Sequence, residues 1–406
     1  MSEIVVSAQR LIGLPDDDSG PGWIAIHGDR IADAGRGTPP RTPDVVVDDG
    51  VLVPGLIDAQ INGAFAVDFA EADAADVRRV AEEMLATGVT TMVPTFITAP
   101  IDDLVEQVVR YDAARRASNA TGDATRLLSA HVEGPFLSPR RRGAHREELL
   151  VDPTPEHIAP LIALADSISY VTLAPEREGA LQAIAAFVAA GIRVAVGHSD
   201  ASDVQVRAAA DAGATLVTHL FNAQRPLHHR APGVVGAALS DQRLTLGLIA
   251  DGHHVEPTAV LLAFGAARGR VMLVTDAVAA LGMPAGTYEL GGDQIIVTVG
   301  APALRADGTI AGADEPLDAD IGHTVDAGVD LVDAVRAATR TPADALGLDD
   351  VGRFEPGAYA DFVVLGHDLR TRATWLGGRQ VWTADDTMHE GPSAARTDAT
   401  VAPGPH

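Results

Sequence analysis

The sequence contains neither cysteine nor lysine. The absence of cysteine excludes disulfides, thiolate metal sites and a cysteine nucleophile. All 30 basic residues are arginine, which excludes Schiff-base catalysis, a phosphate-binding loop built on lysine, and a carboxylated lysine that bridges two metal ions. Any catalytic chemistry therefore has to use histidine, carboxylates, amides, hydroxyl groups or arginine.

Basic charge is also scarce, because 56 acidic residues stand against 30 arginines and give a formal net charge of −26. This charge argues against a nucleic acid or an anionic membrane as a partner. An anionic substrate would need local arginines or backbone N–H groups. No apolar run is long enough to span a bilayer, and the first residues do not have the pattern of a signal peptide. We therefore expect a cytoplasmic protein.

The middle of the chain alternates short apolar runs with Ala-rich stretches of helical spacing, such as 75–86, 181–190, 202–212 and 255–267. This alternation predicts an α/β fold, a (β/α)8 barrel of the TIM type, although a doubly wound open sheet also fits the periodicity. The eight expected strands are 51–57, 89–94, 127–132, 168–173, 192–196, 215–218, 244–249 and 271–274.

Both ends of the chain contain β-branched pieces that are too short to be stable alone. We expect residues 1–52 and 353–385 to pair into a small β-sandwich domain, with the barrel at 53–352 between them. Residues 287–298 and 306–309 are interpreted as hairpins inserted after the last barrel strand. The composition of 386–406, which lacks an apolar period, is typical of a disordered tail.

Unusual polar residues follow the expected strands at their carboxyl ends, which in a barrel meet at one mouth. That mouth is the active site of such enzymes. The residues, in chain order, are Asp58, Gln60, Asn62, Glu133, His198, His219, Asp251, His253, His254 and Asp276.

Two imidazoles and one carboxylate from neighbouring strands suit a divalent transition metal, first of all Zn²⁺, with Fe²⁺, Co²⁺ or Mn²⁺ as alternatives. A further carboxylate that does not bind the metal can serve as general base, and Asp276 is placed for that role. Ser138 and Ser199 lack the Gly-x-Ser-x-Gly turn of a serine nucleophile.

Several ordered motifs resemble those of the N-acetylglucosamine-6-phosphate deacetylases, a branch of the amidohydrolase superfamily. The match covers about residues 50–365, and no single motif carries it alone. The motifs are His131-Val-Glu-Gly-Pro-Phe136, Gly143-Ala-His145, Val171-Thr-Leu-Ala-Pro-Glu176, Gly197-His-Ser199, Thr218-His-Leu-Phe-Asn-Ala223, Ala250-Asp-Gly-His-His254 and Val274-Thr-Asp276.

The resemblance implies a metal-dependent hydrolase that cleaves the N-acetyl group of N-acetylglucosamine 6-phosphate to give glucosamine 6-phosphate and acetate. It also implies that Glu133, His198 and His219 bind the metal. Asp276 would then take a proton from the attacking water and protonate the leaving amine. His131, two positions before Glu133 on the same side of the strand, is interpreted as a packed residue one layer deeper.

The resemblance further implies how the substrate is held. His145 would orient or polarise the acetamide, the backbone N–H groups of Asn222 and Ala223 would bind the phosphate, and His254 would contact the ligand. In the homodimer that is usual for the family, Arg230 would reach the phosphate in the neighbouring subunit. An arginine fork matches the geometry of a phosphate.

Two segments differ from the family pattern. Gln60 and Asn62 stand where many amidohydrolases have His-x-His. Because amides are poor zinc ligands, we interpret them as the remnant of a second metal position and predict one tightly bound ion. The second segment, 311–317, brings Asp314 and Glu315 into a region that usually lines the acetyl pocket, so the acyl group or the sugar can differ.

Three alternatives stay open at this point. The substrate can be N-acetylgalactosamine 6-phosphate, or the protein can be another amidohydrolase of the cyclic-amidase type, although the lysine-bridged metal pair of that type cannot be built here. A non-catalytic scaffold is the third alternative. It is disfavoured because a scaffold does not need four polar groups at a barrel mouth.

Overall fold

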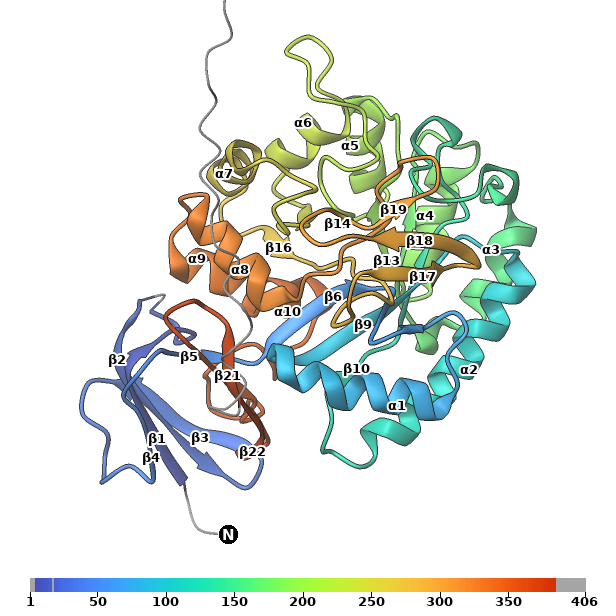
Figure 1. Cartoon of the computed structure of the whole chain (residues 1–406). Helices are drawn as coiled ribbons and strands as arrows, with labels where there is room; N and C mark the ends of the chain where they lie inside the picture. The colour runs from blue at the N-terminus through green and yellow to red at the C-terminus, as the bar shows by residue number, and fades with distance from the viewer. Residues whose placement is uncertain (1–3, 17, 385–406) are drawn as a thin grey trace, which may run out of the picture.

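The structure, a computed structural model, describes residues 4–16 and 18–384. It consists of a barrel of parallel strands surrounded by helices and of a smaller sheet built from both chain ends, drawn in blue and red at the lower left of Figure 1. The predicted α/β class, a (β/α)8 barrel with a small β-sandwich, is confirmed. The expected disordered tail, 386–406, lies outside the described residues. The domain boundaries stay predictions.

The barrel strands run parallel and pair in chain order, except that the short strand Arg126–Leu127 and the strand Ala130–Glu133 both pair with Val89–Ile97. A parallel bridge between Ile61 and Ala277 joins the end of the first strand to the segment after the last one. The strands are β6 (Leu56–Ile61), β9 (Val89–Ile97), β10 (Arg126–Leu127), β11 (Ala130–Glu133), β12 (Ile168–Leu173), β13 (Arg193–Val196), β14 (Leu216–Val217), β15 (Thr245–Leu248) and β16 (Val271–Leu273).

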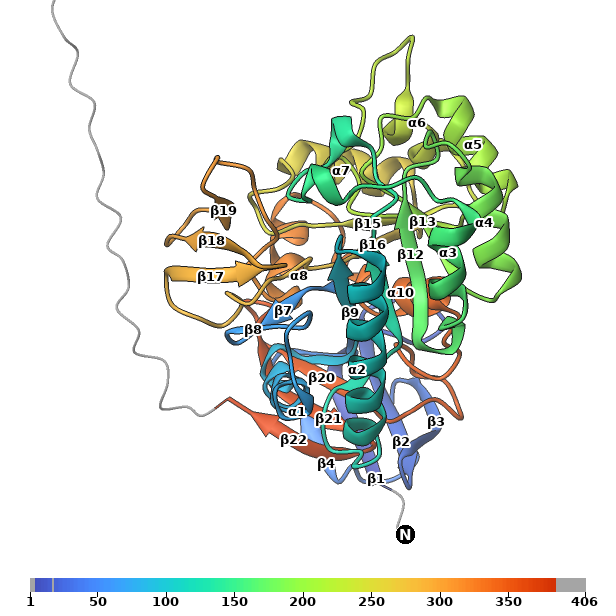
Figure 2. The same ribbon diagram turned by 90° about the vertical axis from the view of Figure 1, so that its right-hand side faces the viewer.

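Helices cover the outside of the barrel and bury apolar faces against it (Figures 1 and 2). They are α1 (Ala74–Glu83), α2 (Ile101–Asn119), α3 (Pro155–Ile162), α4 (Ala180–Ala189), α5 (Asp203–Asp211), α6 (Gly233–Ser240), α7 (Pro257–Ala266), α8 (Leu317–Asp326), α9 (Leu331–Ala337) and α10 (Arg340–Leu346). The loop that leads into α6 projects from the body in both views.

The small sheet combines β1 (Ile4–Leu11), β2 (Gly20–His27), β3 (Arg30–Arg36), β4 (Val45–Val47) and β5 (Val51–Pro54) with β20 (Phe362–Leu365), β21 (Thr371–Leu376) and β22 (Arg379–Thr383). Strand β20 pairs antiparallel with β5, so the two chain ends form one sheet. Its own apolar core includes Leu11, Ile24 and Phe362.

One predicted strand is wrong in its extent. The apolar run 51–57 is two strands, because β5 belongs to the small sheet and β6 to the barrel. Gly55 separates them, and a side chain there would clash with the side chain of Thr90. Within the C-terminal part of the small sheet, β21 and β22 form a hairpin whose turn, Gly377-Gly378, has positive φ angles of 51° and 72°.

The inserted hairpins are present as a three-stranded antiparallel sheet of β17 (Gly286–Leu290), β18 (Asp293–Val297) and β19 (Leu304–Arg305). Leu290 and Ile295 belong to a buried cluster that also includes Val278, just after the last barrel strand. The insertion is therefore packed against the mouth of the barrel. A further two-stranded sheet, β7 (Gly63–Ala64) with β8 (Val67–Asp68), follows β6.

None of the helices within residues 4–16 and 18–384 combines the length and the apolar character needed to cross a membrane.

Helix α8 carries a buried carboxyl group, Asp320, that lacks a hydrogen-bond partner at either oxygen within the described part of the chain. Burial and the nearby charges of Asp251 and Asp58 raise its pKa well above the ordinary value. A buried polar group without partners costs about 1–3 kcal/mol. Asp320 is therefore a source of instability in the barrel wall.

We expect Asp320→Ala to raise the thermal midpoint, because it removes this cost. The folded state holds the proton of Asp320 while the unfolded chain releases it above pH ~4, so wild-type stability falls as pH rises. The gain should thus be larger at pH 8 than at pH 5, as measured by thermal unfolding at both values. Asp326→Ala, at an exposed position of the same helix, is the control. A destabilised Asp320→Ala variant would contradict this account.

Candidate active site

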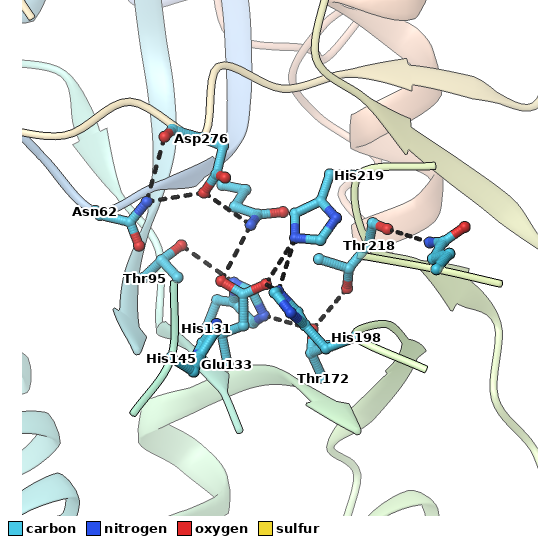
Figure 3. Close-up of polar contacts among 12 residues, drawn as sticks. Asn62, Thr95, His131, Glu133, His145, Thr172, His198, Thr218, His219 and Asp276 are labelled. Carbon is cyan, nitrogen blue, oxygen red and sulfur yellow. Dashed lines mark hydrogen bonds and ion pairs between the residues drawn. The ribbon is translucent and has the colours of Figure 1, made fainter. Parts of the chain in front are cut away.

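The polar residues predicted at the strand ends converge at the carboxyl-terminal mouth of the barrel (Figure 3). Glu133 is the last residue of β11, whereas His198, His219 and Asp276 each stand a few residues beyond β13, β14 and β16. The last three have positive φ angles of 45°, 27° and 50°. Non-glycine residues are strained there, and such strain concentrates at functional sites.

Three ligand atoms meet in one buried cluster. Glu133 Oε1 lies 3.1 Å from His198 Nε2 and 3.1 Å from His219 Nε2, and the two imidazole nitrogens are 3.0 Å apart. Nδ1 of His198 donates to the carbonyl of Arg141 at 3.0 Å, which leaves Nε2 with a lone pair. The group could hold a metal ion, and its donor set of two imidazoles and one carboxylate fits Zn²⁺ with positions left open.

The electrostatics of the cluster also favour a cation. Burial opposes ionisation of Glu133, but the two imidazoles beside it, those of His198 and His219, hold its pKa well below the ordinary value. Burial likewise opposes the charge of His219, yet Glu133 raises the pKa of this imidazole. A positive charge is thus favoured where the three ligand atoms meet.

Asp276 faces this cluster and is held by two amides of β6 and its extension. Its Oδ1 accepts hydrogen bonds from Gln60 Nε2 at 2.9 Å and Asn62 Nδ2 at 2.8 Å. Burial and the charge of Glu133 raise the pKa of Asp276. A carboxylate with a raised pKa is a better proton acceptor, as a general base requires.

Two further histidines point at the cavity with defined tautomers. Nδ1 of His145 lies 2.8 Å from the hydroxyl of Thr98 and accepts the backbone N–H of the same residue at 3.4 Å, so Nε2 carries the hydrogen. Burial lowers the pKa of His145, which keeps it neutral. In His254, Nδ1 donates to Asp251 Oδ2 at 2.7 Å, so Nε2 faces outward as an acceptor. Burial opposes ionisation of Asp251, but His254 holds its pKa at about 2.

The cavity has a volume of about 290 Å³. It brings together the predicted residues Asn62, Glu133, His145, His198, His219, Asn222, Ala223, His254 and Asp276. The apolar wall of the cavity, which includes Ile97, Leu290 and Ile310, was not predicted from the sequence. The hairpin insertion, which interrupts the alternation of strands and helices, could have indicated this wall. A segment inserted after the last strand can cover the mouth of the barrel.

Asn222 and Ala223 are among the residues that line this cavity. The backbone N–H of Asn222 donates to the carbonyl of His219 at 3.0 Å. Its side-chain Nδ2 is buried and, within the described residues, has no partner. Ala223 adopts a positive φ of 49°. The side-chain amide of Asn222 is thus a further donor available to a ligand.

Arg230 does not join the cavity of its own chain. It is exposed on the projecting loop before α6, where its Nη1 lies 2.8 Å from His229 Nε2. Its predicted role in a neighbouring subunit stays a prediction.

His131 lies one layer below Glu133 and is fully buried. It stacks on Tyr170 at 3.9 Å between ring centroids and contacts the hydroxyl groups of Thr95 and Thr172. Burial lowers its pKa to about 3. These contacts agree with its interpretation as a packed residue.

Of the unusual segment 311–317, only Ala311 and Gly312 line the cavity. Glu315 lies within 4.0 Å of Arg370, and burial together with the charge of Asp251 raises the pKa of Asp314. Neither Asp314 nor Glu315 is among the residues that line the cavity.

Comparison with known proteins identifies the class first. The family model described as "Amidohydrolase family" matches residues 51–381. This chain therefore belongs to the amidohydrolase family.

Within that family the chain is similar to deacetylases of phosphorylated amino sugars. It is 39% identical to human N-acetylglucosamine-6-phosphate deacetylase over 82% of this chain and 84% of that one. It is 38% identical to N-acetylgalactosamine-6-phosphate deacetylase of Escherichia coli O157:H7, over 88% and 95%. A solved N-acetyl-D-glucosamine-6-phosphate deacetylase of Mycobacterium smegmatis, in complex with N-acetyl-D-glucosamine-6-phosphate, superposes with a TM-score of 0.88 at 38% identity, covering 94% of this chain and 100% of that one.

Proposed function

We propose that this protein hydrolyses the N-acetyl group of N-acetylglucosamine 6-phosphate to give glucosamine 6-phosphate and acetate, a step of amino-sugar catabolism. The observation that carries the proposal is the convergence of Glu133, His198, His219 and Asp276 in one buried cavity. Relatives with this named activity match most of the chain. N-acetylgalactosamine 6-phosphate is the second candidate, supported by the similarity to the E. coli enzyme.

Glu133, His198 and His219 would hold one divalent ion, first of all Zn²⁺ with Fe²⁺, Co²⁺ or Mn²⁺ as alternatives. Such an ion supplies a Lewis acid that polarises the amide carbonyl and makes water a better nucleophile at neutral pH. Within the described residues, Glu133, His198 and His219 form the one group of three histidine and carboxylate side chains close enough together to hold a metal ion. We therefore propose a single tightly bound ion.

Asp276 would take the proton of the attacking water and then deliver it to the nitrogen of the leaving amine. Neutral His145, with hydrogen on Nε2, would donate a hydrogen bond to the acetamide oxygen as negative charge develops there. The acceptor Nε2 of His254 would bind a sugar hydroxyl, which has a hydrogen to donate.

Acetate release distinguishes these functions. The zinc-loaded protein is assayed with N-acetylglucosamine 6-phosphate, with N-acetylgalactosamine 6-phosphate and with unphosphorylated N-acetylglucosamine, before and after chelation of the metal. We expect release from a phosphorylated sugar and its loss after chelation. If neither phosphorylated sugar releases acetate, the proposal is wrong.

Arg230→Ala tests the proposed homodimer. An arginine–phosphate contact contributes about 1.5–3 kcal/mol, so we expect kcat/KM for the phosphorylated sugar to fall roughly 10- to 100-fold, mainly through KM. The unphosphorylated sugar should be unaffected. Arg268→Ala, at an exposed arginine after α7, is the matched control. An equal loss with both sugars would place Arg230 in another role.

Mixed dimers sharpen the same test. In a dimer of one Arg230→Ala chain and one Asp276→Asn chain, one site combines an intact Asp276 with an arginine from the other subunit. We expect co-expressed mixtures of the two variants to regain the wild-type KM for the phosphorylated sugar. If the KM of the mixtures stays as high as that of the Arg230→Ala variant, Arg230 does not act across an interface.

A further inference from the structure

Gln60 and Asn62 occupy the places that we interpreted as a vestige of a second metal position. Both residues are buried, but their side chains make specific hydrogen bonds in addition to packing contacts. Their amides converge on a single atom, Oδ1 of Asp276, at 2.9 and 2.8 Å (Figure 3). Gln60 Nε2 also lies 3.3 Å from Glu133 Oε2, so one amide connects the proposed base with a proposed metal ligand.

The backbone around these residues is tied in the same way. The N–H of Asp276 donates to the carbonyl of Gln60 at 2.9 Å, and the N–H of Asn62 donates to the carbonyl of Ala277 at 2.7 Å. Asp58, two residues before Gln60, accepts from the hydroxyl of Thr275 at 2.5 Å. The end of β6 therefore fixes the strained backbone of Asp276, and the two amides then fix its side chain.

An ionised carboxylate can only accept hydrogen bonds, so both amides must present their NH₂ groups to Asp276. Oδ1 thus accepts two hydrogen bonds, one from each amide. Oδ2 has no hydrogen-bond partner among the described residues, and Asp276 lines the cavity. The two oxygens of one carboxylate are therefore not equivalent.

We propose that Gln60 and Asn62 are positioning residues for Asp276, holding Oδ1 so that Oδ2 is the atom that exchanges the proton. An amide pair thereby takes over, through hydrogen bonds, the task of orienting this carboxylate that a second cation would otherwise perform. The inference rests on the proposed function in taking Asp276 as the base.

The test uses the zinc-loaded enzyme and variants that delete one donor with little change in volume, Asn62→Leu and Gln60→Met. Each should lower kcat about 10- to 100-fold, as expected for losing a hydrogen bond to a charged group. KM and the single bound zinc should be retained. The double variant should cost less than the product of the two single effects, since both amides hold one atom. Thr91→Val, which removes a buried hydroxyl without a partner in the described structure, is the control and should leave kcat unchanged.

Crystal structures of the same variants separate this inference from the proposed function. We expect the Asp276 carboxylate to leave its position in Asn62→Leu and Gln60→Met, whatever the substrate proves to be. If wild-type enzyme releases no acetate, the proposed function fails while the structures still decide the positioning role. An unmoved Asp276 with unchanged kcat, or a loss confined to KM or to zinc content, would overturn the inference. If Asn62→Leu does not fold, Asn62→Ala removes the same donor with less bulk.

Discussion

Replacing Asp276 with asparagine is expected to lower kcat by roughly two to four orders of magnitude, the usual contribution of a general base. Asparagine keeps the shape of the side chain and an oxygen that can face Gln60 and Asn62, but its amide cannot take up a proton. The three residues proposed to bind the metal are untouched. The zinc content should therefore stay at the wild-type value, as measured by metal analysis beside steady-state kinetics.

The control for this variant is Asp307→Asn, at an exposed position of the inserted hairpin. It should retain the wild-type rate. A rate near wild type for Asp276→Asn would mean that another group accepts the proton. Loss of zinc together with activity would instead make Asp276 a metal ligand.

Glu133→Gln is expected to abolish tight metal binding and, with it, turnover. The carboxylate is the only negative charge that contacts both His198 and His219 in the described structure. Loss of a group that merely supports a ligand costs about 10- to 100-fold in metal affinity or activity, so loss of a ligand should cost more. After dialysis, the Glu133→Gln variant should contain almost no zinc. Excess zinc in the assay should restore part of the rate of acetate release.

Glu147→Gln changes an exposed carboxylate in the segment that follows β11 and should bind zinc normally. Full zinc occupancy and full activity in Glu133→Gln would refute the proposed ligand set. A wild-type protein that holds two ions tightly would refute the single-metal proposal, and with it the interpretation of Gln60 and Asn62.

The sequence predicts the barrel well because buried parallel strands are almost uniformly apolar and the intervening helices are long enough to show their period. The error at 51–57 has the same cause. Strand β5 is buried in the small sheet and β6 in the barrel wall, so both appear as one apolar run. Only pairings between residues distant in sequence, Val53 with Val363 and Leu56 with Val89, show that the chain passes from one sheet to the other there.

The site was predictable to the extent that strand ends meet at one mouth. That rule brings Glu133 and Asp276 together without knowledge of any contact. It does not give the hydrogen-bond partner of a side chain, which is why the amides of Gln60 and Asn62 appeared to be vestigial. For Arg230 the sequence predicts a role that the structure of one chain does not test, because the proposed partner of this side chain belongs to another subunit.

The shared sheet of the two chain ends has a consequence for synthesis on the ribosome. Leu52 of β5 pairs with Val364 of β20, so the first strands emerge long before the strands that complete their sheet. Until then β5 exposes one unpaired, apolar edge, the kind of surface that promotes aggregation. The barrel, whose successive strands pair mostly with their neighbours in sequence, can assemble during this delay. The small domain is therefore the last part to be completed, and a chain that stops before Phe362 would leave that edge permanently open.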